Sequence, residues 1–508
     1  MTVQAAIAAP NPMATQAGLN ALARGGNAVD AAVAAMVTAS VTEPGIIGPL
    51  GGCFLNIWPV HGEPCVIDGN VEMPGRSAPK DRFGAGLIEC VTTYGGGMTT
   101  YAGPGSVATP GMFAAMGAAH RQFGAADWAG LFHTAAVSVR DGFPLSQTAA
   151  SYLALVAHTI FAWEPQARGL YTDQGQGLPA GHLIRDGALA QTLEQIGAEG
   201  ATSLYTGDLA HRIAADVQDR GGLLDLADLA AYRPVLRPAL RTRLRGWDLA
   251  CNPPPAIGGP VLTAMLRLVG EITAPVQPTD AARVMRQVLD LRLHRVDVAD
   301  DLEAAGHELL ETIARLGDVG LPTSASTAHV SVVDEDGMSC AVTASAGYGS
   351  GMSLAGTGML ANNALGETEL NRRGLHALSP GTRLASNMAP TTGRHDDGSH
   401  LSIGSPGADR ITTALLQVLI HFCLHGQDLQ HAVNAPRIHL RHLEDGSVRI
   451  DHERDVDLAA SLAGQELARH EHDPHAMYFG GVGAALRGAD GTLSAAADPR
   501  RAAATAVG

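Results

Sequence analysis

Lysine is almost absent from this 508-residue chain, in which Lys80 is the only one and the other cationic side chains are arginines. A Schiff-base lysine or a P-loop lysine is therefore excluded at every other position. Acidic residues outnumber basic ones by 50 to 34, which gives a formal net charge of −16. This charge argues against nucleic acid and against an anionic membrane surface as partners.

Long apolar runs and paired cysteines are lacking too. No stretch approaches 18 uninterrupted apolar residues, so we expect no membrane-spanning helix. The six cysteines form no C-x-x-C pair, a pattern typical of buried structural thiols. Met1 to Ala5 carry no positive charge ahead of an apolar run, so a cytoplasmic protein is expected.

Hydrophobic residues make up 46% of the chain, enough for a large core, and their spacing predicts mixed helix and strand. Apolar residues three or four apart predict helices over residues 13–24, 27–42, most of 110–235, 260–316 and 409–424. Short apolar or alternating runs predict strands over residues 54–60, 65–68, 327–334, 338–345 and 401–403. The polar segment 317–326 is predicted to be an exposed linker, and the last eight residues to be frayed.

The strand predicted at 327–334 begins with a threonine that is a candidate hidden N-terminus. If the bond between Ser326 and Thr327 were cut, Thr327 would carry a free α-amine beside its hydroxyl. An α-amine has a pKa of about 7.7–8, so it is a ready base at neutral pH. This pairing is the N-terminal-threonine form of an activated nucleophile.

The turn after this strand decides which residue faces Thr327. A two-residue loop would place Ser345 opposite Ala328, whereas a three-residue loop with Gly337 in the left-handed conformation would place Ser345 opposite Thr327. We favour the three-residue loop, which brings the Ser345 hydroxyl within reach of Thr327.

Five segments follow one another along the chain: MATQAGLNALARGGNAVDAAVAAMVTASVTEPGIIGPLGGCF (13–54), TAHVSVVDEDG (327–337), GTGMLANN (356–363), PGTRLASNMAPT (380–391) and GSPGADRI (404–411). In this order and spacing they resemble the γ-glutamyltranspeptidase family. The resemblance implies an α+β protein with the four-layer αββα fold of N-terminal-nucleophile hydrolases.

The resemblance also implies that one precursor cuts itself between Ser326 and Thr327. The products would be a large subunit (1–326) and a small subunit (327–508), intertwined in one fold as a heterodimer, alone or as a dimer of such heterodimers. Thr327 would be the nucleophile and Ser345 its partner. Backbone N–H groups of Gly407 and Ala408 would form the oxyanion hole.

The positions that bind the glutamyl group in the family are altered in this chain. The arginine that clamps the α-carboxylate is replaced by Asn70, and the serine pair beside it becomes Ser386-Asn387. The acid that pairs with the α-amine falls on Glu367, and two amide side chains that help it fall on Gly347 and Ala364. Loss of a guanidinium removes a bidentate carboxylate clamp, so a neutral or amide-bearing acyl group is expected.

We therefore expect a self-processing hydrolase that uses no cofactor and no metal. It would cut a C–C or C–N bond next to a carbonyl in a small specialised-metabolite intermediate, as in the branch that resembles the C–C hydrolases of 4-alkyl-proline biosynthesis in antibiotic pathways. The alternatives are a small-amide acylase, a γ-glutamyl hydrolase or transpeptidase acting on glutathione-like substrates, and a non-processing binding protein on the same fold.

Two groups of histidines remain. His329 shares a face with Thr327, and we expect it to make a structural hydrogen bond because the α-amine already supplies the base. His470, His472 and His475 stand close together near Pro474, and a solvated loop is favoured over a metal site because distant partner ligands are missing.

Overall fold

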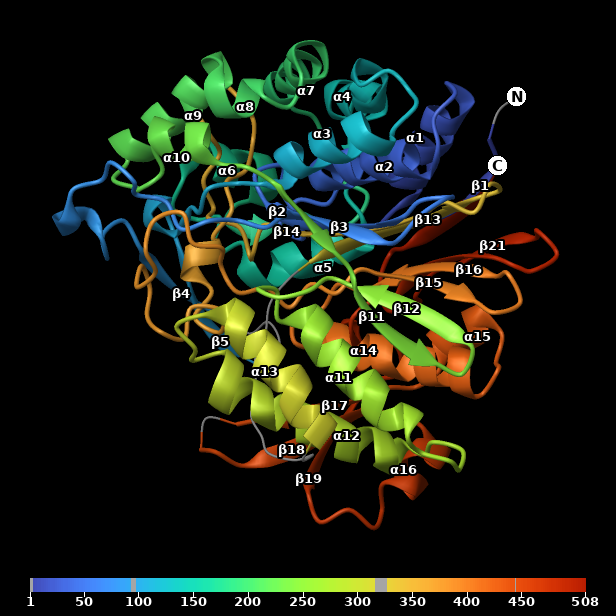
Figure 1. Ribbon diagram of the computed structural model, residues 1–508. Coiled ribbons are helices and arrows are strands. Elements are labelled where there is room, and N and C mark those ends of the chain that lie inside the picture. The colour runs from blue at the N-terminus through green and yellow to red at the C-terminus, as the bar shows by residue number, and fades with distance from the viewer. Residues whose placement is uncertain (1–2, 93–96, 316–326, 444) are drawn as a thin grey trace.

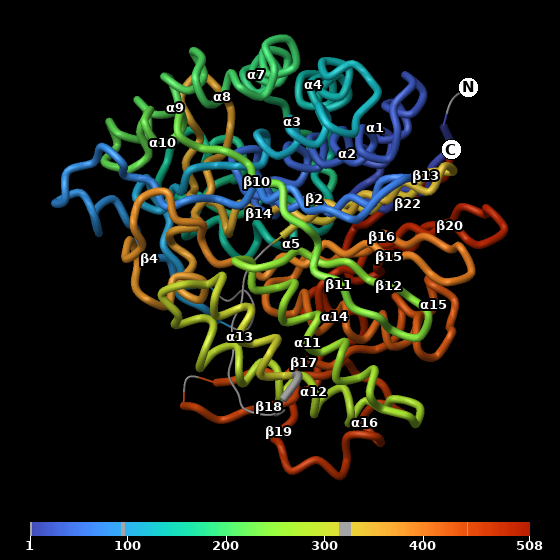
Figure 2. Tube along the Cα trace, viewed as in Figure 1, coloured from blue at the N-terminus to red at the C-terminus, as the bar shows by residue number. Residues whose placement is uncertain are grey.

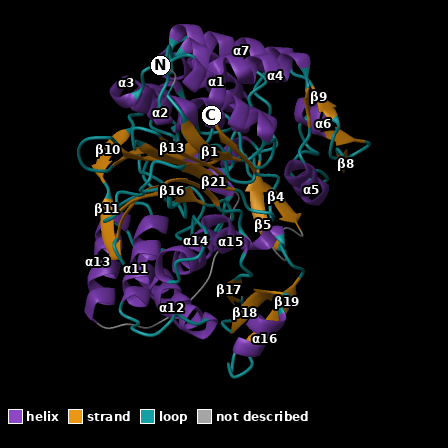
Figure 3. Ribbon diagram, turned by 90° about the vertical axis from the view of Figure 1, so that its right-hand side faces the viewer, coloured by secondary structure: helices purple, strands orange, loops and turns teal. Residues whose placement is uncertain are grey.

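Two β-sheets packed face to face form the centre of the molecule, and helices cover both outer faces (Figures 1 and 3). The computed structural model describes residues 3–92, 97–315, 327–443 and 445–508. The upper sheet has seven strands in the order β10 (Val235–Pro238), β3 (Cys65–Gly69), β2 (Gly52–Trp58), β14 (Ser339–Ser345), β13 (Ala328–Asp334), β1 (Ala5–Ala9) and β22 (Ala504–Val507). The lower sheet has six, in the order β11 (Leu240–Leu244), β12 (Trp247–Cys251), β15 (Thr391–His395), β16 (His400–Gly404), β20 (Gly483–Arg487) and β21 (Leu493–Ala496).

The helices above the seven-stranded sheet come from the first half of the chain. They are α1 (Pro12–Ala23), α2 (Ala28–Thr42), α3 (Met112–Phe123), α4 (His133–Asp141), α7 (Gly187–Glu199), α8 (Ser203–Thr206), α9 (Asp208–Asp219) and α10 (Leu226–Ala231), with α5 (Gln147–Val156) and α6 (Pro165–Tyr171) to one side. A β4–β5 hairpin (Ile88–Thr92 and Met98–Ala102) lies at one side of the molecule, below these helices. Together with the sheet they bury the larger of the two cores.

The helices below the six-stranded sheet bury the second core. They are α11 (Gly258–Gly270), α12 (Pro278–Leu291), α13 (Leu302–Arg315), α14 (Arg410–Leu419), α15 (Leu429–Asn434) and α16 (Val456–Ser461). A small sheet of β17 (Ile438–His442), β18 (Val448–Glu453) and β19 (Ala468–His472) lies at the bottom. No helix in the described residues is long and apolar enough to cross a bilayer.

The first two helices begin where the sequence predicts because each has an asparagine cap. Asn11 accepts a hydrogen bond from the Ala14 N–H at 2.9 Å. Asn27 and Asp30 form a reciprocal capping box at the start of α2. Every residue of α2 is buried, which explains its composition of small apolar side chains.

The β13–β14 hairpin has the predicted three-residue loop. The Asp334 N–H donates to the Met338 carbonyl at 3.1 Å, and Gly337 has φ +88°. The register pairs Ala328 with Ala344, which sets Thr327 opposite Ser345. The hairpin lies between β1 and β2, so segments from both ends of the chain alternate across the sheet (Figure 2).

Two helical predictions gain detail from the structure. The helical pattern predicted over 260–316 is confirmed as far as Arg315 and comprises three α-helices, because turns separate α11, α12 and α13 and a proline starts α12. The predicted helix 409–424 is α-helical only to Leu419 and continues as a π-helix over Ile420–Leu424. The linker predicted at 317–326 lies outside the described residues.

The frayed C-terminus predicted from composition is wrong. β22 pairs antiparallel with β1, and the Ala5 N–H donates to the Gly508 carbonyl at 2.8 Å. β1, near the start of the chain, and the C-terminal strand β22 therefore lie side by side (Figure 2).

The prediction of a solvated loop around His470 and His472 is wrong as well, because both belong to β19, which pairs with β18. His472 stacks on Tyr478 with ring centroids 4.5 Å apart, whereas His475 is exposed in the turn that follows. No cluster of metal-ligating side chains occurs among the residues that the structure describes.

Candidate functional site

A cleft opens at the end of the β13–β14 hairpin and gathers most of the predicted site residues. Its volume, as the space open to the centre of a water-sized molecule, is about 30 Å³. Its polar lining consists of Asn70, Thr327, Ser345, Glu367, Ser386 and Asn387, and its remaining lining consists of Val71, Gly347, Ala364, Leu370, Leu384, Ala385, Met388 and Ala408. Segments that are far apart in sequence thus meet at the first residue of the hairpin.

Thr327 is buried, with 3% of its surface exposed. Ser345 ends β14 directly across the register, and its Oγ accepts a hydrogen bond from the Gly347 N–H at 3.1 Å. The two hydroxyls therefore line the same cleft from neighbouring strands, as the favoured turn requires.

Gly407 and Ala408 lie between β16 and α14, where the chain turns sharply. Their φ angles are +121° and +69°, and the second is unusual for an alanine. Neither N–H makes a backbone hydrogen bond with the described residues. Ala408 lines the cleft, whereas Gly407 is not among its lining residues. A free N–H in the same cleft as Thr327 is one of the donors that an oxyanion hole needs.

Glu367 is the only ionisable side chain among the described residues that line the cleft. It is 2% exposed, and its Oε2 has no hydrogen-bond partner among the described residues. Burial, and then the neighbouring Glu369, raise its pKa well above the ordinary glutamate value. A positively charged or N–H-bearing ligand group would satisfy this oxygen.

Asn387 is the other unsatisfied group. Neither its Oδ1 nor its Nδ2 has a partner within the described chain, although both are buried. An orphaned amide in a cleft costs about 1–3 kcal/mol per unmade bond, so a bound partner that pairs with it is favoured. The Ser386 Oγ, in contrast, already accepts from the Met388 N–H at 3.3 Å.

Asn70 presents an acceptor to the cleft. Its Nδ2 donates to the Leu384 carbonyl at 2.7 Å, and a carbonyl can only accept, which fixes the amide orientation. The nearby Arg383 does not replace the missing clamp, because it donates to the Asn70 carbonyl at 2.8 Å, pairs with Glu72 and stacks on Tyr232. No arginine, lysine or histidine is among the described residues that line the cleft.

His329 makes the predicted structural contacts. Its Nδ1 lies 2.8 Å from the Thr343 Oγ1 and its Nε2 lies 2.7 Å from the Ser331 Oγ. Burial lowers its pKa to about 3, so the ring is neutral at pH 7. Gly404 of β16 faces this ring, and a Cβ there would lie 2.2 Å from it. The side chain thus fills the space between the two sheets.

The sequence interpretation missed the apolar lining of the cleft. Leu384, Ala385 and Met388 lie inside the same 380–391 segment as Ser386 and Asn387, and Val71 follows Asn70. These residues adjoin predicted polar site residues in the sequence, and this adjacency is the signal that could have identified them as lining residues. Leu370 carries no such signal, because the turn after Glu367 brings it in.

The chain is similar to known proteins over nearly its whole length. The chain matches the Gamma-glutamyltranspeptidase family over residues 14–296 and 311–508. It is 29% identical over 540 residues to the Glutathione hydrolase proenzyme of Escherichia coli (strain K12), covering 98% of this chain and 90% of that protein. It is 29% identical over 520 residues to the Acylase ACY 1 proenzyme of Pseudomonas sp. (strain SE83), covering 96% and 90% respectively.

Two solved structures share the whole fold. The cephalosporin acylase from Bacillus halodurans superposes with a TM-score of 0.78 at 23% identity, covering 99% of this chain and 96% of that one. LmbA2991T421A superposes with a TM-score of 0.81 at 22% identity, covering 99% of both chains. The predicted N-terminal-nucleophile hydrolase fold is thereby confirmed. With its family matched over nearly its full length, the chain is an enzyme that belongs to the gamma-glutamyltranspeptidase family.

Proposed function

We propose that the chain is a self-processing hydrolase in which Thr327 forms an acyl-enzyme with a small specialised-metabolite intermediate and cuts a C–C or C–N bond next to its carbonyl. The observation that carries this proposal is the meeting of Thr327, Ser345 and the free N–H of Ala408 in one cleft with no basic side chain in its described lining. No cofactor is required for these steps.

Self-cleavage would come first. The Thr327 hydroxyl oxygen attacks the Ser326 carbonyl carbon, the C–N bond breaks, and the nitrogen becomes the free amine of Thr327. Water then hydrolyses the new ester, which returns the hydroxyl and leaves a carboxylate on Ser326. The products would be the subunits 1–326 and 327–508. The names of the two curated relatives, both proenzymes, support such processing.

Turnover would use the same hydroxyl again. The Thr327 amine takes the hydroxyl proton while the oxygen attacks the substrate carbonyl, and the N–H groups of Gly407 and Ala408 stabilise the oxyanion. The scissile bond breaks, the leaving atom receives the proton, and water releases the acyl group. Ser345 would orient the threonine from the opposite strand.

The cleft favours an acyl group without a free carboxylate. Asn70 presents an acceptor, Glu367 has an unsatisfied buried oxygen, and no cation faces them from the described lining. The acyl part would then carry an amine or ring N–H that pairs with the Glu367 carboxyl. A neutral polar group on it would pair with the Asn387 amide. The apolar side chains of Leu370, Leu384 and Met388 would cover the rest.

An acylase of small amides is the second candidate, supported by the acylase names among the relatives and neighbours. It uses the same cleft and the same steps with an amine as leaving group. Action on γ-glutamyl compounds, as in the name of the Escherichia coli relative, is disfavoured by the missing cation. A non-processing binding protein would have no need of the free Ala408 N–H in the same cleft as Thr327.

Denaturing gel electrophoresis of the purified protein tests the proposal. We expect two bands, the smaller beginning at Thr327 by N-terminal mass analysis, and a single uncut band for Thr327→Ala. Ser331→Ala, which changes a hydroxyl elsewhere on the same strand, is the matched control and should process. A wild-type chain that stays uncut for days would refute the proposal, because an uncut Thr327 has no free amine.

A further inference from the structure

A larger cavity adjoins the cleft at Thr327, which is called the acyl cleft below. The acyl cleft has about 30 Å³ open to the centre of a water-sized molecule, whereas this second cavity has about 370 Å³ by the same measure. One water needs roughly 10–15 Å³ of such space, so the acyl cleft holds about two or three. Leu370 and Ala385 are the lining residues that the two spaces share among the residues described, and they therefore stand between them.

The second cavity offers apolar surface and no net charge. Its described lining carries four acidic and four basic side chains, so their formal charges cancel. Two of the basic groups are visibly paired, because Arg373 contacts Asp300 at 2.5 Å and Arg237 contacts Asp68 at 3.0 Å. Apolar side chains, Leu378 among them, complete the lining. An uncharged alkyl chain suits this space better than a carboxylate or an ammonium group, since neither charge would find an unmatched counter-charge there.

The backbone of Leu370 is fixed by the turn that also carries Glu367. The Leu370 N–H donates to the Glu367 carbonyl at 3.0 Å. The side chain of the next residue, Asn371, donates to the Glu367 carbonyl at 2.9 Å and to the Ala364 carbonyl at 2.8 Å. These bonds involve no atom of the Leu370 side chain, which packs against the larger core. The side chain can therefore be shortened while the turn and Glu367 stay in place.

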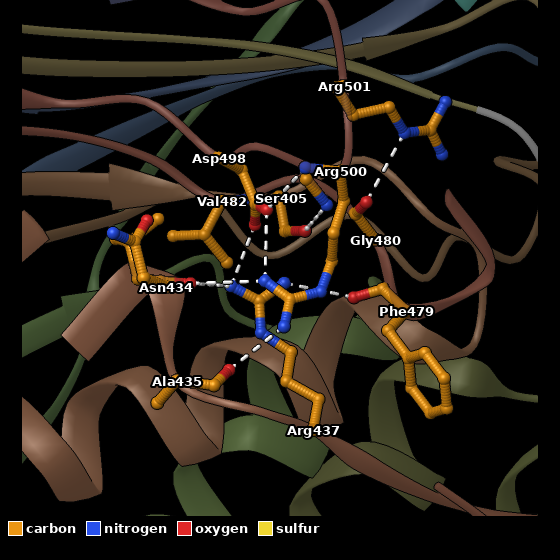
Figure 4. A network of polar contacts seen from close by, with 12 residues as sticks. Ser405, Asn434, Ala435, Arg437, Phe479, Gly480, Val482, Asp498, Arg500 and Arg501 are labelled. Atoms are coloured by element: carbon orange, nitrogen blue, oxygen red, sulfur yellow. Dashed lines mark hydrogen bonds and ion pairs between the residues drawn. The ribbon is translucent and has the colours of Figure 1, made fainter. Parts of the chain in front are cut away.

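The acyl cleft has no comparable room behind Ala408. A Cβ on the adjacent Gly407 would lie 2.7 Å from the Cα of Gly480, so backbone packs on backbone there. The Phe479 carbonyl next to Gly480 accepts from the Arg437 Nη1 at 3.0 Å, within the buried network of Figure 4. A longer acyl group cannot enter on this side without breaking that network, whereas toward the second cavity it meets only two side chains.

We propose that Leu370 sets the maximum length of the acyl group by closing the acyl cleft toward the second cavity. The inference rests on the proposed function, in which the acyl carbonyl lies at Thr327 and the rest of the acyl group lies in the cleft. Ala385 contributes only a methyl group to the boundary, so the leucine side chain supplies most of the barrier. Once that side chain is shortened, the second cavity takes the alkyl end of a longer acyl group.

Binding is tested without turnover by ¹⁹F NMR titration of two uncharged acyl mimics, 4,4,4-trifluorobutanamide and 8,8,8-trifluorooctanamide. We expect the purified wild type to bind the longer amide no more tightly than the shorter one. Leu370→Ala should bind the longer amide about tenfold more tightly or better, since several methylene groups become buried, and should change the binding of the shorter amide little.

Leu378→Ala is the matched control, because it removes the same atoms from a leucine that lines the second cavity alone. It should keep the wild-type preference. Adding Ala385→Leu to Leu370→Ala refills the boundary and should reverse the gain. Leu370→Val, a smaller change, should give a smaller gain and replaces Leu370→Ala if that variant does not fold. Wild-type binding that already strengthens with length, or an equal gain in Leu378→Ala, would overturn the inference.

A second measurement separates this inference from the proposed function. In a series of p-nitroanilides from acetyl to octanoyl, wild-type kcat/KM should fall beyond a short chain, and Leu370→Ala should raise the octanoyl-to-butanoyl ratio about tenfold or more. Hydrolysis with a length dependence that Leu370→Ala leaves unchanged would keep the hydrolase and refute the role of Leu370. Leu370-dependent binding of the long amide with no hydrolysis of any anilide would keep the boundary and refute the proposed function.

Discussion

Asn70 stands where the resemblance places a carboxylate-clamping arginine, and its amide nitrogen donates one of its two hydrogens to the Leu384 carbonyl. We predict that Asn70→Arg raises the hydrolysis of γ-glutamyl-p-nitroanilide about tenfold or more above a low wild-type rate, because a bidentate donor is worth about 1.5–3 kcal/mol. Initial rates of p-nitroaniline release give the comparison.

Asn70→Gln is the control for this change, since it lengthens the side chain without adding charge and should give no gain. Wild-type turnover as fast as that of ordinary family members would contradict the altered pocket. A fall in γ-glutamyl activity in Asn70→Arg would mean that position 70 does not face the acyl group.

Glu367 is expected to hold a cationic or N–H group of the true substrate. At a pH above the ionisation of Glu367, Glu367→Gln should lower kcat/KM about tenfold to a hundredfold, mainly through KM, because a charge-assisted contact becomes a neutral one. Self-processing of this variant should be unaffected. Its two bands on a denaturing gel would show that the variant folds.

The pH dependence of kcat/KM tests the ionisation of Glu367 independently. Its raised pKa means that the carboxylate forms only at a pH well above the ordinary glutamate range. For a cationic substrate, wild-type kcat/KM should therefore rise with pH through this ionisation, and Glu367→Gln should lack that limb. An unchanged limb in the variant would assign it to another group.

The β13–β14 hairpin contains a second pH-dependent element. Burial lowers the pKa of His329 to about 3 in the folded chain. In the unfolded chain the imidazole binds a proton near pH 6.5, whereas in the folded chain it stays neutral at that pH. Its contribution to stability is complete above about pH 6.5 and is lost as pH falls toward 3. Between pH 7 and pH 5 the loss amounts to about 2 kcal/mol.

Urea unfolding of the wild type and of His329→Gln at both pH values measures this effect. The variant should be less stable at pH 7, since two buried hydrogen bonds are disturbed, but it should lose about 2 kcal/mol less on acidification. The same dependence on pH in both proteins would show that His329 is not the group responsible.

Strands β13 and β22 differ in how far the local sequence pattern predicts them. The alternation and the Gly337 turn predict β13, β14 and their register from local sequence alone. The Ala-rich β22 carries no comparable signal, because its strand character comes from pairing with β1 at the opposite end of the chain. Composition predicted fraying there, and the long-range pairing prevents it.

Across the whole molecule, the proposed subunits interlock. β13 and β14 of the 327–508 segment lie between β1 and β2 of the 1–326 segment, and β22 pairs with β1 from the other side. Separation would expose both edges of β1 and the inner faces of two cores. We predict that the cleaved subunits remain together until denatured.

Size-exclusion chromatography of the processed protein checks this. A single native peak of at least 52.3 kDa should contain both subunits on a denaturing gel. The uncut Thr327→Ala chain serves as the size reference. A small subunit that elutes alone under native conditions would contradict the interlocked arrangement.

The sequence by itself determined the nucleophile candidate, its partner Ser345 and the positions at which the acyl pocket departs from its family. Turn-forming residues and motif spacing are properties of the sequence itself, so they can be identified without knowledge of the fold. Only the tertiary structure decided that Asn70 offers an acceptor, that Asn387 and Glu367 are left unsatisfied, and that Leu370 stands between the acyl cleft and a larger cavity. Hydrogen-bond satisfaction and burial depend on what distant segments bring to the same place, and no local pattern records that.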